Sequence, residues 1–176
     1  MLTNRIKILA VSGSLRANSS NALILQAIEK MIPEHVDFFI YKGLGGLPHF
    51  DDAEEPPLEV SVWRKHLQES DAVIICSPEY AFGVPGSLKN ALDWTVGSGE
   101  LVNKPLALIT ASTGGEKAHA ALLQIFTALS AKIPEGAALL ISYVRSKLNA
   151  AGEITDAATN TAIQTVLDKL IAAVEE

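Results

Sequence analysis

The feature of this 176-residue sequence that most constrains its fold is a set of five short, almost uninterrupted apolar runs. Such runs are typical of strands in a parallel sheet covered on both faces, because those strands have no solvent-facing side. Segments with apolar residues at three- and four-residue spacing, typical of amphipathic helices, follow each run. The runs lie at residues 6–11, 36–40, 72–76, 106–111 and 137–141.

This alternation predicts an α/β fold with an open, doubly wound parallel sheet and right-handed crossovers. The sequence has no internal repeat and no linker-like segment, so we expect one domain over residues 1–176. The one long irregular stretch, 43–57, is rich in glycine and acidic residues and is predicted to be a loop. Ligands of such sheets bind beyond the carboxyl ends of the strands, so the loops after the first, third and fourth strands are the candidate binding segments.

The composition argues against several classes of function. The net charge is −6 and lysines and arginines form no dense cluster, which argues against nucleic acid as a partner. No apolar run approaches the ~18 residues of a membrane span, and the amino-terminal run is short, so we expect a soluble, cytoplasmic protein. Cys76 is the only cysteine, and zinc-ligand spacing is absent, so no internal disulfide and no metal site are predicted. Its apolar neighbours predict a buried, structural thiol.

The loop after the first strand, 12–21, combines many hydroxyl and amide donors with one arginine. A helix N-terminus attracts anions, so this loop predicts a phosphate site. A P-loop would need a lysine and a dinucleotide fingerprint further glycines, so a terminal monophosphate such as that of FMN fits better than a pyrophosphate. The alternative is that a serine only caps the helix and the arginine is solvated. The predicted ligands are Ser14, Arg16, Ser19, Ser20 and Asn21.

The loops after the third and fourth strands predict a place for a flat ring. Residues 78–83 hold two aromatic residues and free backbone amides, which suit the face and edge of a flavin; the alternative is an apolar loop packed on a second subunit. Residues 112–115 contain two glycines, and the amides at the following helix start are expected to stabilise negative charge on a reduced flavin; the alternative is a cap from Thr113. The predicted ring-binding residues are Pro78, Glu79, Tyr80, Ala81, Phe82, Gly83, Ser112, Thr113, Gly114 and Gly115.

Together these segments resemble the NADPH-dependent FMN reductases, a flavodoxin-like group that includes quinone, chromate and azo-dye reductases. The resemblance is carried by GSLRANSSN at 13–21, SPEYAFGVPGSLKNALDW at 77–94 and STGG at 112–115, and LPHFD at 47–51 is similar to the family's loop after the second strand. It implies a three-layer αβα sandwich with a five-stranded parallel sheet in the order 2-1-3-4-5. The chain departs from the family at Ala81, where relatives usually carry Asn or His.

The resemblance also implies a function. Bound FMN would pass a hydride from NADPH or NADH to a flavin, a quinone or a similar small acceptor, and the cofactor would supply the chemistry. No catalytic residue is therefore predicted, and Glu79 is not expected to act as a general base. Relatives assemble as homodimers or homotetramers with the flavin near an interface. The alternatives are a non-enzymatic, flavodoxin-type electron carrier and a flavin-dependent redox sensor; the arginine in the first loop favours the reductase.

Overall fold

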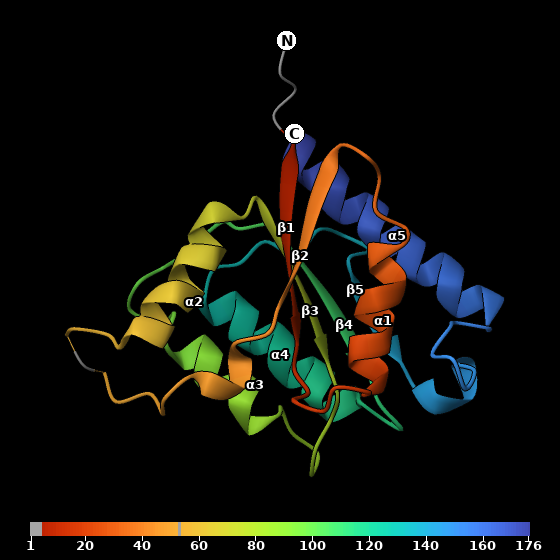
Figure 1. The fold of residues 1–176 in the computed structure, drawn as a ribbon, viewed down its shortest axis with the longest axis horizontal. Helices are drawn as coiled ribbons and strands as arrows, with labels where there is room; N and C mark the ends of the chain where they lie inside the picture. Colours follow the sequence, from red (N-terminus) through yellow and green to blue (C-terminus); the bar gives the residue numbers. More distant parts are fainter. Residues whose placement is uncertain (1–4, 53) are drawn as a thin grey trace.

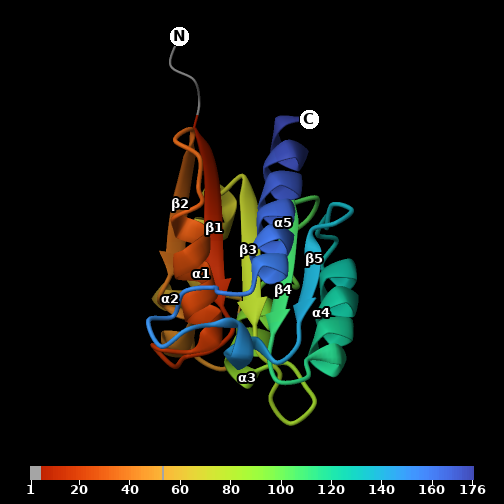
Figure 2. The same cartoon turned by 90° about the vertical axis from the view of Figure 1, so that its right-hand side faces the viewer.

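The computed structural model describes residues 5–52 and 54–176, which form a five-stranded parallel sheet between two layers of helices (Figures 1 and 2). The order β2-β1-β3-β4-β5 confirms the predicted topology. Residues 1–4, ahead of the first predicted strand, and Ala53, within the predicted loop, lie outside the described residues. The strands are β1 (Ile6–Ser12), β2 (Val36–Tyr41), β3 (Ala72–Ser77), β4 (Leu106–Ala111) and β5 (Ala138–Ile141).

The helices divide between the two faces of the sheet. Helices α1 and α5 cover one face, and α2, α3 and α4 cover the other (Figure 1). No helix in the described part of the chain is long and apolar enough to cross a membrane. The α-helices are α1 (Ser20–Glu29), α2 (Leu58–Glu69), α3 (Gly86–Asp93), α4 (Glu116–Ala128) and α5 (Ala157–Glu175), and two short 3₁₀ helices are η1 (Leu44–Gly46) and η2 (Val144–Lys147).

The continuous apolar runs are explained by burial of the strands on both faces. Successive side chains of a strand point to opposite faces, so Ile8 packs under α1 and α5 whereas Leu9 packs under α2, α3 and α4. Strands β3 and β4 are buried at every position. Each large apolar side chain buried in this way contributes about 1.5–3 kcal/mol, which makes the sheet a rigid base for the loops at its edge.

The site is positioned by the point at which the strand order reverses. The chain passes from β1 to β2 on one side of β1, and β3 lies on its other side. The loops after β1 and β3 therefore diverge beyond the carboxyl ends of these strands. At their base the Gly13 N–H donates to the Cys76 carbonyl at 2.8 Å. A Cβ atom on Gly13 would lie 2.7 Å from Ser77 Oγ, so only glycine allows this close approach.

Candidate functional site: a cavity at the carboxyl edge of the sheet

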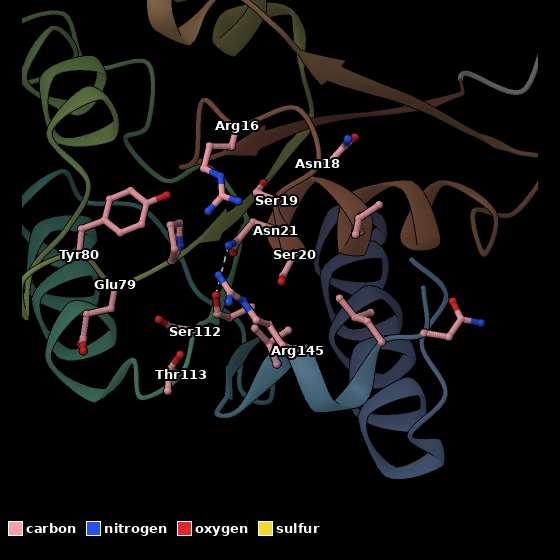
Figure 3. Close-up of a pocket in the computed structure, with 16 residues that line it drawn as sticks. Arg16, Asn18, Ser19, Ser20, Asn21, Glu79, Tyr80, Ser112, Thr113 and Arg145 are labelled. Atoms are coloured by element: carbon pink, nitrogen blue, oxygen red, sulfur yellow. Dashed lines mark hydrogen bonds between the residues drawn. The ribbon is translucent and has the colours of Figure 1, made fainter. Parts of the chain in front are cut away.

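A cavity of about 460 Å³ opens where the loops after β1, β3 and β4 meet (Figure 3). This volume lies within the range of small-molecule sites, ~300–1,000 Å³. The segment after β5 closes its remaining side. The lining residues are Arg16, Asn18, Ser19, Ser20, Asn21, Leu23, Pro78, Glu79, Tyr80, Ala111, Ser112, Thr113, Val144, Arg145, Leu148 and Asn149.

The start of α1 presents open backbone donors to this cavity. Ser19 is the N-cap: its Oγ accepts from the Ala22 N–H at 3.1 Å and its carbonyl from the Leu23 N–H at 3.0 Å. The N–H groups of Ser20 and Asn21 have no acceptor among the described residues, as expected for a first helical turn. The serine therefore does cap the helix, and the cap still leaves two donors for an anion.

Asn21 holds the start of α1 in place through its side chain, which is only 2% exposed. Its Nδ2 donates to the Ala111 carbonyl at 3.2 Å, and its Oδ1 accepts from the Cys76 thiol at 3.3 Å. Burial raises the pKa of Cys76, so the thiol stays protonated and serves as a donor. The predicted buried, structural thiol is thereby confirmed, and the carboxamide of Asn21 joins α1 to β3 and β4.

The segment after β3 is a tight hairpin. Tyr80 and Gly83 exchange two backbone hydrogen bonds of 3.0 and 2.9 Å around Ala81 and Phe82, which have φ values of 49° and 59°. Turns of this kind favour Asn-Gly, so two ordinary residues in this conformation are strained. Phe82 is 81% exposed at the tip. Tyr80 bends back, and its Oη lies 3.1 Å from Ser14 Oγ, which links the hairpin to the first loop.

Glu79 caps a helix that belongs to a different loop. Its Oε2 accepts from the Ala118 N–H at 2.8 Å, in the first turn of α4. The N-cap position of α4 is Gly115, with φ of 112° and no side chain to bond, so the alternative of a Thr113 cap is wrong. The Glu79 carboxylate therefore offsets part of the positive charge at this helix start, which was expected to stabilise negative charge on a reduced flavin. Glu79 instead holds the loops after β3 and β4 together.

The structure therefore brings most of the predicted residues to one cavity. Six of them lie outside its lining. One bonds to Tyr80, three belong to the hairpin after β3, and two are the glycines directly before α4. Those six are Ser14, Ala81, Phe82, Gly83, Gly114 and Gly115.

The segment after β5 is the part of the site that sequence reasoning missed. It contributes Arg145, whose guanidinium points into the cavity, together with Val144, Leu148 and Asn149 (Figure 3). A signal was present, because the carboxyl end of a fifth parallel strand lies at the same edge as the others and an arginine follows it.

The cavity has donors for an anion and lacks an acid–base pair. None of its lining residues is a histidine, and its one carboxylate, Glu79, is bonded to a backbone amide. No group of three or more metal-ligating side chains occurs in residues 5–52 and 54–176. An arrangement of this kind suits chemistry that a bound cofactor supplies.

Comparison with known proteins agrees with this geometry. The family model for NADPH-dependent FMN reductase matches residues 6–145. A 2-hydroxy-1,4-benzoquinone reductase from Burkholderia is 31% identical over 97% of both chains, and a quinone reductase from Escherichia coli K12 is 27% identical over 90% of this chain and 89% of its own.

Among solved structures, the flavoenzyme NAD(P)H:(acceptor) oxidoreductase FerB from Paracoccus denitrificans matches with a TM-score of 0.77 and 26% identity over 97% of both chains. The family match spans all five strands and the three loops that carry the sequence motifs. The chain belongs to the NADPH-dependent FMN reductase family and is an oxidoreductase that uses FMN and a nicotinamide nucleotide.

Proposed function

We propose that the chain, as one FMN-binding domain over residues 1–176, holds FMN in the cavity at the carboxyl edge of the sheet and transfers electrons from NADPH or NADH to a small quinone-type acceptor. The observation that carries the proposal is the convergence of three loops on one cavity, with an open helix start on one side and an aromatic hairpin on the other. The acceptor class follows the quinone reductases among the relatives.

The phosphate end of FMN fits the α1 side of the cavity. Arg16 is exposed, has no carboxylate partner in the described part of the chain, and points into the cavity (Figure 3). The N–H groups of Ser20 and Asn21 add two backbone donors and the partial positive charge of a helix start. A guanidinium beside such donors is well matched to a dianionic monoester.

The ring end of FMN fits the hairpin side. Tyr80 offers an aromatic face, and its hydroxyl is oriented by the 3.1 Å contact with Ser14. Ser112 and Thr113 line the opposite wall, and their carbonyls accept from the Val144 and Tyr143 N–H groups of the segment after β5. When bound, FMN relays a hydride from the nicotinamide nucleotide to the acceptor, and the residues named here bind and orient it.

The test is a reduction experiment on the purified protein reconstituted with FMN. Under anaerobic conditions, NADPH or NADH should bleach the visible absorption of the bound flavin, and a benzoquinone should restore it over many turnovers. Bound flavin that neither nucleotide reduces would favour the electron-carrier alternative. A protein that does not bind FMN would refute the proposed site.

Two arginine variants test the phosphate end directly. Arg16→Gln should lower FMN affinity by about 1.5–3 kcal/mol, the contribution of a charge-assisted hydrogen bond. Arg5→Gln is the matched control, because Arg5 precedes β1 at the opposite edge of the sheet and pairs with Asp37 at 2.7 Å. Equal FMN affinity in the two variants, measured by quenching of flavin fluorescence, would place the phosphate elsewhere.

We also propose that the chain assembles as a homodimer or homotetramer through the hairpin. The support is the exposure of two aromatic side chains there, Tyr80 at 48% and Phe82 at 81%. Phe82 lies outside the cavity, so Phe82→Ser should shift the mass measured by light scattering towards the monomer while FMN binding is retained. An unchanged mass would exclude this surface as the main contact.

A further inference from the structure

The four arginines of the chain fall into two classes. Arg5 lies 2.7 Å from an aspartate and Arg64 lies 3.9 Å from a buried glutamate. Arg16 and Arg145 have no carboxylate partner among the described residues, and both line the cavity. In a protein of net charge −6, the two unneutralised guanidinium groups therefore meet in a single cavity.

The backbone that carries Arg145 is firmly attached to the site. The Tyr143 N–H donates to the Thr113 carbonyl at 3.0 Å, and the Val144 N–H donates to the Ser112 carbonyl at 3.1 Å. Val144 is only 4% exposed, and Tyr143 adopts a left-handed conformation with φ of 53° that turns the chain into η2. A non-glycine residue held in this conformation indicates that its surroundings impose the direction of the chain.

The side chain of Arg145 then enters the cavity from the side opposite Arg16. Figure 3 shows Arg16 reaching in from the loop after β1 and Arg145 from η2, with Asn21 between them in this view. Glu79 is the only carboxylate in the lining, and its Oε2 already accepts from the Ala118 N–H. An anion between the two guanidinium groups would be the partner that both lack.

We propose that Arg145 is a second phosphate-binding residue, which closes on the 5′-phosphate of FMN opposite Arg16. This inference rests on the proposed FMN site. A phosphate monoester carries about −1.5 to −2 charge at neutral pH, so one guanidinium neutralises roughly half of it and a second completes the balance. The two arginines together would make the site select FMN over riboflavin, which has the same ring and no phosphate.

The experiment titrates the apoprotein with FMN and, in parallel, with riboflavin, following quenching of flavin fluorescence. Arg145→Gln should weaken FMN binding roughly 10- to 100-fold, the range expected for one charge-assisted bond, and leave riboflavin binding within about twofold. Arg145→Lys should retain part of the FMN affinity, because lysine keeps the charge and loses the planar fork. Arg5→Gln, which removes the same charge far from the cavity, should change neither.

Several outcomes would overturn the role of Arg145 in phosphate binding and leave the proposed FMN site unchanged. Arg145→Gln with unchanged FMN affinity, beside a weakened Arg16→Gln, would remove Arg145 from the phosphate and keep Arg16 there. Equal losses for FMN and riboflavin would mean that Arg145 only shapes the cavity. A higher KM for NADPH and not for NADH, with unchanged FMN affinity, would assign Arg145 to the 2′-phosphate of the nucleotide.

One outcome would overturn the proposed FMN site as well. If neither Arg16→Gln nor Arg145→Gln changes FMN affinity, the phosphate does not bind between them. Circular dichroism of each variant verifies its fold; if Arg145→Gln unfolds, the ratio of FMN to riboflavin affinity in Arg145→Lys decides the question, because only a phosphate contact lowers that ratio.

Discussion

The two helices that begin beside the cavity, α1 and α4, are capped in opposite ways. Helix α1 is capped locally by Ser19, and the N–H groups of Ser20 and Asn21 remain open. Helix α4 is preceded by Gly115, which has no side chain to offer, and its cap comes from Glu79, 39 residues before the Ala118 amide that it binds. One helix start is therefore open to an external anion, and the other already holds an internal one.

This difference shows that position at the carboxyl edge does not decide the role of a helix start. Both offer the same partial positive charge. At α1 a short local cap leaves that charge to a ligand, whereas at α4 the carboxylate of Glu79 uses it to fix the loops after β3 and β4 against each other. Loss of the α1 cap should therefore affect mainly that helix, and loss of the α4 cap should loosen two loops at once.

The largest effect is expected from Glu79→Ala. The Ala118 N–H would lose its acceptor and the two loops their link, so the free energy of unfolding should fall by about 2 kcal/mol. Glu79→Gln keeps a carbonyl acceptor of similar size and should recover part of the loss. Urea denaturation of the apoprotein measures both. A variant with unchanged stability but slower NADPH turnover would show that Glu79 acts on the bound groups and not as a cap.

The next effect is expected from Ser19→Ala. Removal of this N-cap should lower the free energy of unfolding by about 1 kcal/mol, because the Ala22 N–H loses its side-chain acceptor. The matched control is Ser20→Ala, one residue later in the same turn, whose hydroxyl has no partner in the described part of the chain. A larger loss in Ser20→Ala than in Ser19→Ala would mean that the cap is wrongly assigned.

The same contrast explains what the sequence could and could not predict. The strands and the α1 cap depend on residues that are neighbours in the chain, so the apolar runs located the strands, and the serines before α1 indicated a cap without deciding which serine supplies it. The Glu79–Ala118 bond joins residues 39 apart and the Asn21–Ala111 bond residues 90 apart, and no local pattern encodes such pairs. Arg145 was missed although it follows the fifth predicted strand, because only the folded sheet shows that η2 lies beside α1.

A smaller, stabilising effect is expected from Ala81→Asn in the hairpin that carries Glu79. Ala81 has φ of 49°, a conformation that asparagine tolerates better, so the free energy of unfolding should rise by about 0.5 kcal/mol. Ala151→Asn, at an exposed loop alanine outside the left-handed region, is the control and should not stabilise. If the hairpin positions the capping carboxylate, the gain from Ala81→Asn should shrink in the Glu79→Ala background; a full gain there would separate the two features.

The smallest effect is a pH dependence within α4 itself. Burial lowers the pKa of His119 below its usual 6.5, and its Nδ1 lies 2.8 Å from Thr110 Oγ1, which ties α4 to β4 beneath the Glu79 cap. Below about pH 6.5 the unfolded chain therefore protonates His119 more readily than the folded chain does. The contribution of neutral His119 to stability is complete above that pH and is lost as the pH falls.

Urea denaturation near pH 7.5 and near pH 5.5 tests this dependence. The difference in the free energy of unfolding between the two pH values should be smaller in His119→Gln than in the wild type. His49→Gln, at an exposed histidine, is the control for the loss of one imidazole. Equal pH dependence in His119→Gln and the wild type would assign the proton uptake to another group.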